Sequence, residues 1–312
     1  MPQYIYSFKY EAHLLDLCQL EARQLFGQQQ QDNILFSDIK IDPSISPFIL
    51  GRFEVMRTAT DYQQLLKLIR MMNIQTDGFK VDYFSLEGDG ARFEERQKMM
   101  KDVGYSIFAV PDFKQPSVVY SICTDQKQWY FGKLKRHDGD WRKHKNKPFS
   151  FSNSIDIHTG KTLVSLASKG NKAHALLDAC CGAGTVLLEG AIAGFNISGC
   201  EINPRTFYHT VKNLNHYGYE LDIHLSDVAE LDKTYDGIII DLPYNLYSAS
   251  TDEVTQNIIQ SAARMSTRVV IVSISDIEEV IASANLKVVD QCVVEKRGYS
   301  KFSRTIWLCE HR

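Results

Sequence analysis

The C-terminal half of the chain alternates short apolar runs with amphipathic stretches, which is typical of a parallel sheet with crossover helices. Strands are predicted at 175–180, 197–202, 222–227, 235–241 and 268–275, and helices at 186–193, 204–217, 252–265 and 276–285. The clearest helix follows Asn203 and Pro204, a favourable N-cap and first-turn pair. Two longer runs, 286–298 and 303–310, are predicted to form an antiparallel hairpin. The pattern predicts an α/β, doubly wound sheet that ends in a C-terminal hairpin.

The N-terminal half has a mixed order of elements. Strands are predicted at 4–8, 48–59, 79–86, 117–124 and 128–134, and helices at 13–26 and 91–103. The four glutamines and aspartate at 28–32 are predicted to form a surface loop. No catalytic constellation is visible in this half, which is therefore predicted to be a small α/β module that serves another purpose.

The composition is that of a soluble globular protein, with 312 residues, 44% hydrophobic and 23% charged. The start, MPQYIYSFKYEAHLL, lacks the basic and apolar regions of a signal peptide. The apolar runs are far shorter than the roughly 20 residues that a membrane helix needs. Seven cysteines, an odd number without zinc-site spacing, indicate reduced thiols and no metal site. A cytoplasmic protein without a membrane or metal partner is expected.

One basic segment stands out against a formal net charge of −3. Residues 133–147, KLKRHDGDWRKHKNK, hold seven Lys/Arg against two Asp. Such an excess attracts phosphates, although a solvated linker between domains explains it equally well. The candidate RNA-binding side chains are Lys133, Lys135, Arg136, Arg142, Lys143, Lys145 and Lys147. Nearby Trp129, Tyr130, Phe131 and Trp141 are candidates for stacking on bases, with core packing the alternative for the first three.

The stretch LLDACCGAGTVLLEG at 176–190 joins a predicted strand to a helix through a glycine loop. Gly182 and Gly184 would let the backbone approach a ligand at the helix N-terminus. The loop is shorter than the GxGxxG dinucleotide fingerprint, which makes NAD binding less favourable. A simple strand-to-helix turn is the alternative. The candidate cofactor-binding residues here are Asp178, Ala179, Cys180, Gly182 and Gly184.

The next two strands also end in carboxylates. Glu201, followed by Ile202, stands where a doubly wound fold receives the two hydroxyls of a ribose, or else where a charge stabilises a helix dipole. Asp227, followed by Val228, could accept a hydrogen bond from the amine of an adenine, or could cap a helix. Each stretch is ambiguous alone, but all occur at the strand ends where such a sheet has its ligand crevice.

The fourth strand ends in Asp-Leu-Pro-Tyr-Asn at 241–245. Taken alone, this is a buried strand that ends in a turn. Beside the other three stretches, it completes an S-adenosylmethionine site with an amino-methylating centre. Asp241 and the Leu242 carbonyl would accept the two N–H bonds of an exocyclic amine, Pro243 would stiffen the turn and Tyr244 would stack on the base.

Residues 155–312 resemble a class I, Rossmann-like, S-adenosylmethionine-dependent N-methyltransferase. DACCGAGT resembles the cofactor loop of that fold, and DLPY resembles its (D/N)PPY motif. Leu242 replaces the first proline of that motif, and Ala179 and Ala183 replace the usual Pro and Thr of the loop. The Leu242 backbone carbonyl, which this position is expected to contribute, is retained.

The order SNSIDIHTGKTLVSLAS, then LLDACCGAGTVLLEG, is similar to the THUMP-containing tRNA guanosine N2-methyltransferases. FKVDYFSL, the following helix, DVGYSIF and the strand pair that ends in WYFGKL resemble the N-terminal module and THUMP domain of that family. The resemblance implies an N-terminal α/β module at 1–50, a THUMP-like RNA-binding domain with a basic linker at 51–148, and a methyltransferase domain at 149–312.

The leading interpretation is an RNA base N-methyltransferase that acts on guanine N2 of tRNA. The alternatives are a DNA adenine or protein amide N-methyltransferase, and a non-catalytic RNA-binding protein with the same fold. A cysteine nucleophile is less favoured, because Cys180, Cys181 and Cys200 lack a neighbouring histidine and suit packing or cofactor lining. The sequence leaves open the modified nucleotide, mono- versus dimethylation and the oligomeric state.

Overall fold

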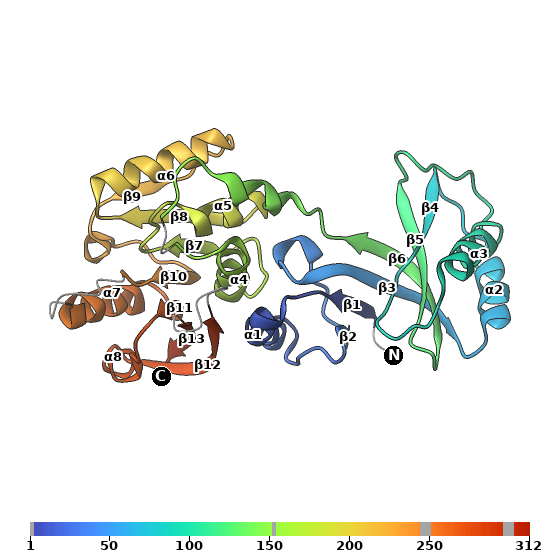
Figure 1. Cartoon of the computed structure of the whole chain (residues 1–312), viewed down its shortest axis with the longest axis horizontal. Helices are drawn as coiled ribbons and strands as arrows, with labels where there is room; N and C mark the ends of the chain where they lie inside the picture. Colours follow the sequence, from blue (N-terminus) through green and yellow to red (C-terminus); the bar gives the residue numbers. More distant parts are fainter. Residues whose placement is uncertain (1–2, 152–153, 244–250, 296–302) are drawn as a thin grey trace. The chain divides into compact units, whose positions relative to one another are not determined.

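The computed structural model describes residues 3–151, 154–243, 251–295 and 303–312 (Figure 1). The chain forms two compact units. The N-terminal unit comprises residues 1–9, 29–44 and 48–138, and the C-terminal unit comprises 10–28, 45–47 and 139–312. These boundaries differ from those predicted at 50 and 148, because a helix from the start of the chain packs within the C-terminal unit.

The C-terminal unit is built on a seven-stranded sheet in the order β12-β13-β11-β10-β7-β8-β9. Its strands are β7 Ala175–Asp178, β8 Asn196–Glu201, β9 Ile223–Leu225, β10 Gly237–Asp241, β11 Arg268–Ser273, β12 Leu286–Glu295 and β13 Ser303–His311. Strands β7 to β11 pair in parallel, whereas β13 is antiparallel to both β11 and β12. The predicted doubly wound sheet and its antiparallel strand pair are therefore confirmed.

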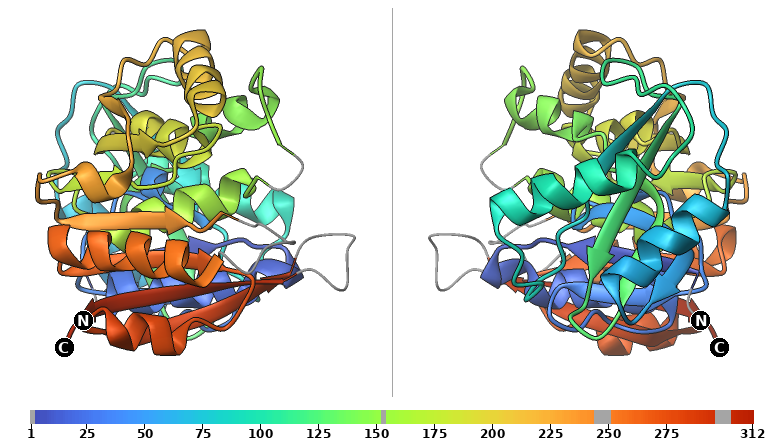
Figure 2. Two further views of the ribbon diagram at one scale, coloured as in Figure 1. Left: turned by 90° about the vertical axis from the view of Figure 1, so that its left-hand side faces the viewer. Right: turned by 90° about the vertical axis from the view of Figure 1, so that its right-hand side faces the viewer.

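Helices cover both faces of this sheet. They are α4 Ile157–Ser168, α5 Thr185–Ile192, α6 Pro204–His216, α7 Thr251–Met265 and α8 Glu278–Ser283, with short 3₁₀ helices η1 Ala12–Leu14, η3 Asp140–Asn146 and η4 Val228–Glu230. Helices α4 and α5 pack on β7, β8 and β10, while α7 and α8 pack on β11 and β12 (Figure 2). Asn203 caps α6 as predicted, accepting from the backbone N–H groups of Arg205 and Thr206 at 2.9 and 3.2 Å.

The strand order places the site. Strands β7 and β10 are neighbours, and the chain continues from them toward opposite edges of the sheet. A doubly wound sheet opens a ligand crevice at this reversal, beyond the carboxyl ends of its strands. Gly237 helps α4 to lie close to β10, because a Cβ at this position would stand 2.4 Å from the Ala167 carbonyl oxygen. The last residues of β7, β8 and β10 therefore converge on one crevice.

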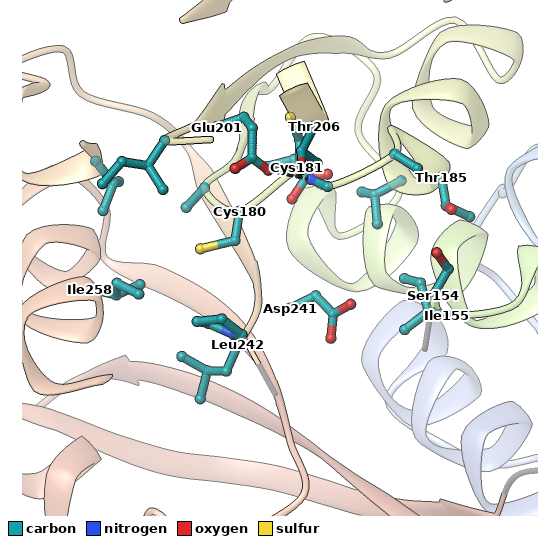
Figure 3. A pocket seen from close by; sticks show the side chains of 18 of the residues that line it. Ser154, Ile155, Cys180, Cys181, Thr185, Glu201, Thr206, Asp241, Leu242 and Ile258 are labelled. Atoms are coloured by element: carbon teal, nitrogen blue, oxygen red, sulfur yellow. Dashed lines mark hydrogen bonds between the residues drawn. The ribbon is translucent and has the colours of Figure 1, made fainter. Parts of the chain in front are cut away.

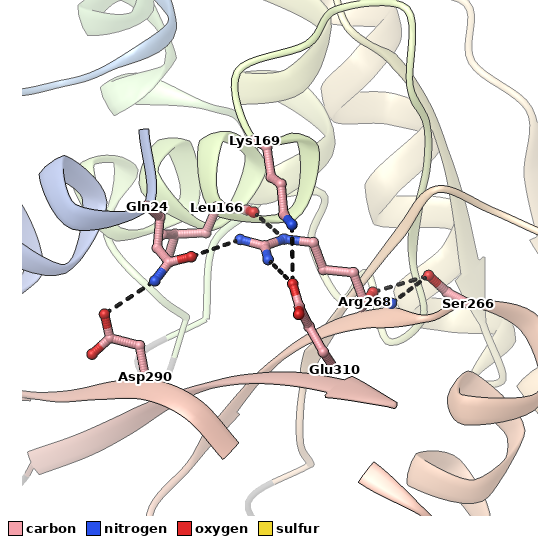
Figure 4. Close-up of polar contacts among 7 residues, drawn as sticks. All are labelled: Gln24, Leu166, Lys169, Ser266, Arg268, Asp290 and Glu310. Carbon is pink, nitrogen blue, oxygen red and sulfur yellow. Dashed lines mark hydrogen bonds and ion pairs between the residues drawn. The ribbon is translucent and has the colours of Figure 1, made fainter. Parts of the chain in front are cut away.

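Helix α1 Leu15–Phe26 belongs to the C-terminal unit through a polar network at its end (Figure 4). Gln24 donates to Asp290 of β12 at 3.1 Å and accepts from Arg268 of β11 at 3.2 Å. The buried Arg268 guanidinium also donates to the Leu166 carbonyl at 2.8 Å and to Glu310 at 2.7 Å. One cation thus connects α1, α4 and two strands.

A second attachment of α1 is fully buried. The Glu21 carboxyl accepts hydrogen bonds from the hydroxyls of Ser46 and Ser165, and Ser165 lies on α4. Burial raises the pKa of Glu21 to about 7, and the two hydroxyls oppose that shift. Contacts of this kind join residues far apart in sequence, so local patterns do not show in which unit α1 packs.

The N-terminal unit contains a six-stranded sheet in the order β2-β1-β3-β6-β5-β4. Its elements are β1 Tyr4–Phe8, β2 Ile34–Ser37, β3 Ile49–Ala59, α2 Tyr62–Met71, β4 Phe79–Tyr83, α3 Phe93–Gly104, β5 Val118–Thr124 and β6 Trp129–Arg136, with a 3₁₀ turn η2 at Pro43–Ile45. Only β4 and β5 pair in parallel. The mixed α/β unit is confirmed, although the sequence analysis does not anticipate β2 or α2.

No helix in the four described ranges has both the length and the apolar composition of a membrane span.

Candidate active site

A cavity of about 500 Å³ lies at the carboxyl ends of β7, β8 and β10 (Figure 3). The residues that sequence reasoning assigned to the site and that line this cavity are Asp178, Ala179, Cys180, Gly182, Glu201, Ile202, Asp227, Val228, Asp241, Leu242 and Pro243. Gly184 belongs to the glycine loop as the N-cap of α5 but does not line the cavity. Tyr244 is outside the described residues. Four stretches separated by tens of residues therefore contribute to one site.

The structure also adds lining residues that sequence reasoning missed. Phe151, Ser154 and Ile155 come from the segment before α4, while Asn257 and Ile258 come from α7. The only sequence signal in the segment before α4 is its serine content, which does not identify individual binding residues. Helix α7 has no sequence motif that predicts binding. These residues reach the cavity through tertiary packing alone.

Two side chains of α6 fix the glycine loop between β7 and α5 by hydrogen bonds to its carbonyl groups. Gly182 and Gly184 have φ values of +54° and +78°, which residues other than glycine rarely adopt. The Thr210 hydroxyl donates to the Gly182 carbonyl, and the Asn213 amide donates to the Ala183 carbonyl at 2.8 Å. The loop is thus fixed in a conformation that presents the N-terminus of α5 to the cavity.

Asp178 is the most unusual group in the site. Its side chain is 1% exposed, and neither oxygen has a hydrogen-bond partner of ordinary geometry among the described residues, although the Cys180 backbone N–H approaches it. Burial raises the pKa of Asp178 well above its usual range, and the charges of Asp241 and Glu201 raise it further. A cationic ligand would relieve both effects.

Glu201 and Asp227 already make local hydrogen bonds. Glu201 accepts from the Gly182 N–H at 3.0 Å and from the Asn203 N–H at 2.8 Å, one bond to each oxygen. Asp227 accepts from the Ala229 N–H at 2.9 Å and caps η4, as the alternative interpretation predicts. A carboxylate oxygen can accept two hydrogen bonds. Glu201 and Asp227 can therefore keep these local bonds and still accept further ones from a ligand.

The turn after β10 brings Asp241 to the cavity. Asp241 is half-buried, and its carboxylate points into the cavity in Figure 3. Leu242 is buried, and its N–H donates to the Val272 carbonyl at 3.1 Å, which extends the β10–β11 pairing by one residue. A carboxylate and a fixed backbone turn therefore lie beside each other at the cavity wall.

All seven cysteines are free. Burial raises the pKa values of the Cys180 and Cys181 thiols well above their usual range, and nearby carboxylates add to the effect. Burial also raises the pKa of Cys200. Neutral thiols are poor nucleophiles. Cys180 and Cys181 line the cavity, which suits contact with a ligand better than covalent chemistry.

The basic segment 133–147 is divided between the two units. Lys133, Lys135 and Arg136 are exposed on β6, with Lys135 paired to Asp42 at 3.0 Å and Arg136 paired to Asp82 at 2.9 Å. In the C-terminal unit, Arg142 and Lys143 are exposed, and Lys143 pairs with Asp140 at 2.7 Å. The Lys145 side chain is outside the described part of the chain, and Lys147 is half-buried. These partners reduce the local charge excess.

Burial decides the role of the nearby aromatic side chains. Tyr130, Phe131 and Trp141 are buried, so the core-packing alternative holds for Tyr130 and Phe131, and Trp141 is not exposed for stacking on a base. Trp129 is half-buried and packs against Tyr62, with ring centroids 5.1 Å apart. Within the described ranges, no group of three or more His, Cys, Asp or Glu side chains could hold a metal ion.

Comparison with known proteins finds a family match in the C-terminal unit. Residues 160–305 match the RMKL-like methyltransferase domain, UPF0020. A tRNA (guanine(10)-N2)-dimethyltransferase of Methanothermobacter thermautotrophicus is 31% identical over 128 residues. That match covers 40% of this chain and 37% of the relative, so the similarity spans little more than a third of the relative's length.

The similarity to solved structures is weaker. TrmN from Thermus thermophilus is 13% identical, with 99% of each chain covered and a TM-score of 0.48. Magnesium protoporphyrin IX methyltransferase from Synechocystis PCC 6803, solved with bound S-adenosylmethionine, is 20% identical, with 55% of this chain and 89% of that chain covered and a TM-score of 0.43. These scores carry no information about the substrate.

Two glycines allow the role of the loop to be tested. Gly184 and Gly194 have nearly equal φ values, +78° and +77°, but a Cβ at Gly184 would stand 3.0 Å from Thr210 Cγ2, whereas a Cβ at Gly194 meets nothing within 4 Å. Both alanine variants should lose about 1 kcal/mol of stability from backbone strain.

Only Gly184→Ala should also displace the loop, and it should weaken binding of S-adenosylhomocysteine at least tenfold in calorimetry. Equal affinities for the two alanine variants would show that the conformation of this loop does not determine binding.

Proposed function

We propose that the protein, whose residues 160–305 are an S-adenosylmethionine-dependent methyltransferase domain, methylates an exocyclic amine of an RNA base, with guanine N2 of tRNA as the target. The observation that carries the proposal is the position of Asp241 and Leu242 on the wall of a cavity that also contains the carboxylates at the ends of β7 and β8. The similarity to a tRNA (guanine(10)-N2)-dimethyltransferase supports the choice of base.

The cavity fits the cofactor in charge and shape. The unpartnered Asp178 carboxylate would receive the ammonium group of the methionine moiety. Glu201, at the end of β8, would accept hydrogen bonds from the ribose hydroxyls, and Asp227 would accept one from the adenine amine. The side chains of Ile202, which is 65% exposed, and Val228 would cover the faces of the adenine ring. When bound, S-adenosylmethionine supplies an electrophilic methyl group on a sulfonium.

The chain's own contribution to catalysis is at the end of β10. An exocyclic amine is a poor nucleophile, because its lone pair is conjugated into the base. Asp241 and the Leu242 carbonyl would accept its two N–H bonds, favour a pyramidal nitrogen and stabilise the positive charge that develops there. Asp241 would then hold the proton that the nitrogen loses. Pro243 restricts the turn, and Tyr244 stays a prediction for stacking on the base.

A second cavity of about 620 Å³ provides a route for the base. It shares Phe151, Ser154 and Ile155 with the cofactor cavity. Its lining includes the cations Arg142, Lys147 and Arg304, which suit RNA phosphates, and also the acids Glu11, Asp156 and Glu295. A base in a paired stem must leave its stack to enter, at a cost of a few kcal/mol, and contacts in this cavity would offset part of that cost.

The N-terminal unit would hold the rest of the RNA. The sequence resemblance of residues 51–148 to a THUMP-like domain supports this role, and Lys133, Lys135 and Arg136 are exposed on β6. These side chains would bind phosphates of the tRNA. Arg142 and Lys143 of the C-terminal unit are separate candidates for phosphate binding. The pairing of Lys135, Arg136 and Lys143 with aspartates means that RNA must compete with these ion pairs.

Replacement of Asp241 tests the proposed catalytic role. Asp241→Asn keeps the size of the side chain and removes the charge that accepts the amine proton, so methyl transfer to a tRNA transcript should fall about a hundredfold or more. Asp232→Asn, which removes an exposed carboxylate outside the cavity, serves as the control. Transfer of radiolabelled methyl groups measures the rates, and calorimetry should show cofactor affinity within about threefold of wild type. Near wild-type transfer by Asp241→Asn would overturn the assignment.

The raised pKa of Asp178 predicts a pH dependence of cofactor binding. Protonation removes the charge that receives the ammonium group, so affinity should fall as pH decreases through the raised pKa, by up to tenfold per pH unit. Asp178→Asn should bind S-adenosylhomocysteine more weakly and lose this dependence. Dissociation constants between about pH 5 and about pH 8 measure both effects. The same pH profile in wild type and variant would exclude Asp178 as the titrating group.

A further inference from the structure

Lys147 has an unusual environment for a residue of a basic surface segment. It is half-buried, and its ammonium group donates a hydrogen bond to the hydroxyl of Thr185. Within the described residues, no carboxylate oxygen lies within 4.0 Å of this ammonium group. The nearby acid, Glu189, is instead bonded to the buried His144, at 2.9 Å. Lys147 is therefore a partly buried cation whose hydrogen-bond partner is a neutral hydroxyl.

Such an arrangement favours an anionic ligand. Burial lowers the pKa of Lys147 to about 8, and the charge of Glu189 opposes this shift. An ammonium group that loses water without gaining an anion is energetically costly. An anion that binds next to it offsets part of this cost, so the position favours a negatively charged group from outside the protein.

The backbone around Lys147 is fixed to the cofactor loop. The Phe149 N–H donates to the Asn213 side chain at 2.9 Å, and the Asn213 amide donates to the carbonyls of Phe149 and Ala183 at 2.9 and 2.8 Å. Phe149 also stacks on His209, with ring centroids 4.4 Å apart. One side chain of α6, Asn213, thus joins Phe149 to the cofactor loop, which holds the neighbouring Lys147 close to that loop.

Thr185 connects Lys147 to the cofactor cavity. It is the first residue of α5 and lines the cavity, on the same side as Ser154 and Ile155 (Figure 3). The helix N-terminus and the ammonium group both favour negative charge at this point. The unpartnered Asp178 carboxylate, 1% exposed, lines the same cavity and favours positive charge. Asp178 on the cavity lining and the Lys147 ammonium group, which is bonded to the lining residue Thr185, are therefore opposite charges for the two ends of a zwitterion.

We propose that Lys147, together with Thr185, binds the α-carboxylate of the cofactor's methionine moiety, opposite Asp178, which receives the ammonium group. This inference rests on the cofactor assignment of the proposed function and reassigns Lys147 from the RNA-binding residues to the cofactor-binding residues. A phosphate of RNA is the competing anion, since Lys147 itself lines the second cavity, whereas its partner Thr185 lines the cofactor cavity. The hydrogen bond to Thr185 and the attachment to the cofactor loop favour the carboxylate.

The test compares two ligands that differ by one group. Calorimetry measures the affinity of S-adenosylhomocysteine and of its decarboxylated analogue, S-adenosyl-3-thiopropylamine, for wild type and Lys147→Met. The variant should bind S-adenosylhomocysteine about tenfold to a hundredfold more weakly, as expected for a lost charged hydrogen bond. It should bind the decarboxylated analogue with wild-type affinity, within about twofold. Lys212→Met, at an exposed lysine of α6, should leave both affinities unchanged.

Four outcomes would overturn the proposal or the assignment on which it rests. Equal weakening of both ligands would show that Lys147 only supports the loop. Unchanged affinity for both ligands would exclude contact with the carboxylate, and loss of tRNA binding in the same variant would assign the anion to RNA. Absence of S-adenosylhomocysteine binding by wild type would remove the cofactor assignment itself. The comparison of the two ligand affinities does not involve tRNA methylation. Its result is therefore independent of which RNA is the substrate.

Proton linkage gives a second readout that a structural role would not change. The groups around the Lys147 ammonium are Glu189 of α5, His144 of η3 and the Thr185 hydroxyl. A bound carboxylate raises the pKa of Lys147 from about 8, so wild type should take up about half a proton more than Lys147→Met on binding S-adenosylhomocysteine at pH 8. Binding enthalpies in buffers of different ionisation enthalpy measure this difference. Equal proton uptake by wild type and variant would contradict the proposal.

Discussion

The concentration of negative charge at the ends of β7, β8 and β10 is the constraint on which the site depends. Parallel pairing forces the last residues of these strands, Asp178, Glu201 and Asp241, to one edge of the sheet. Carboxylates that lose water and face one another are unstable as charges, and the raised pKa of Asp178 expresses this cost. A ligand with a net positive charge, such as a sulfonium cofactor, relieves it.

The surroundings of these acids are rigid. Helix α6 fixes the glycine loop through Thr210 and Asn213, and Asn213 also fixes the segment before α4. The Arg268 network joins α1, α4 and the strands of the hairpin. Such preorganisation matters for methyl transfer, because most of the acceleration comes from aligning the acceptor with the methyl group and from dipoles that need no rearrangement.

Much of this architecture follows from local sequence patterns. The strand-end acids, the glycine loop and the Asn203 cap are encoded within a few residues each, so their positions on the sheet could be predicted. Helix α2 was missed although Asp61 caps it and Leu65, Leu66 and Ile69 form a buried stripe, which is an error of interpretation and not an absence of signal.

Other features arise only from contacts between distant residues. The membership of α1 in the C-terminal unit depends on Glu21 and Gln24 meeting residues more than a hundred positions away. The burial of Trp141 and the partial burial of Lys147 depend on how the segment before α4 packs. A basic run looks the same in sequence whether its lysines face solvent or a cavity, so composition could not separate Lys147 from Lys143.

Nucleoside mass spectrometry of tRNA tests the central claim most directly. Total tRNA is compared between cells with the gene, cells without it, and deletion cells that express either wild type or Asp241→Asn. The proposed function predicts that one N2-methylated guanosine disappears on deletion, returns with wild type and stays absent with Asp241→Asn. An unchanged nucleoside profile in the deletion cells would contradict it.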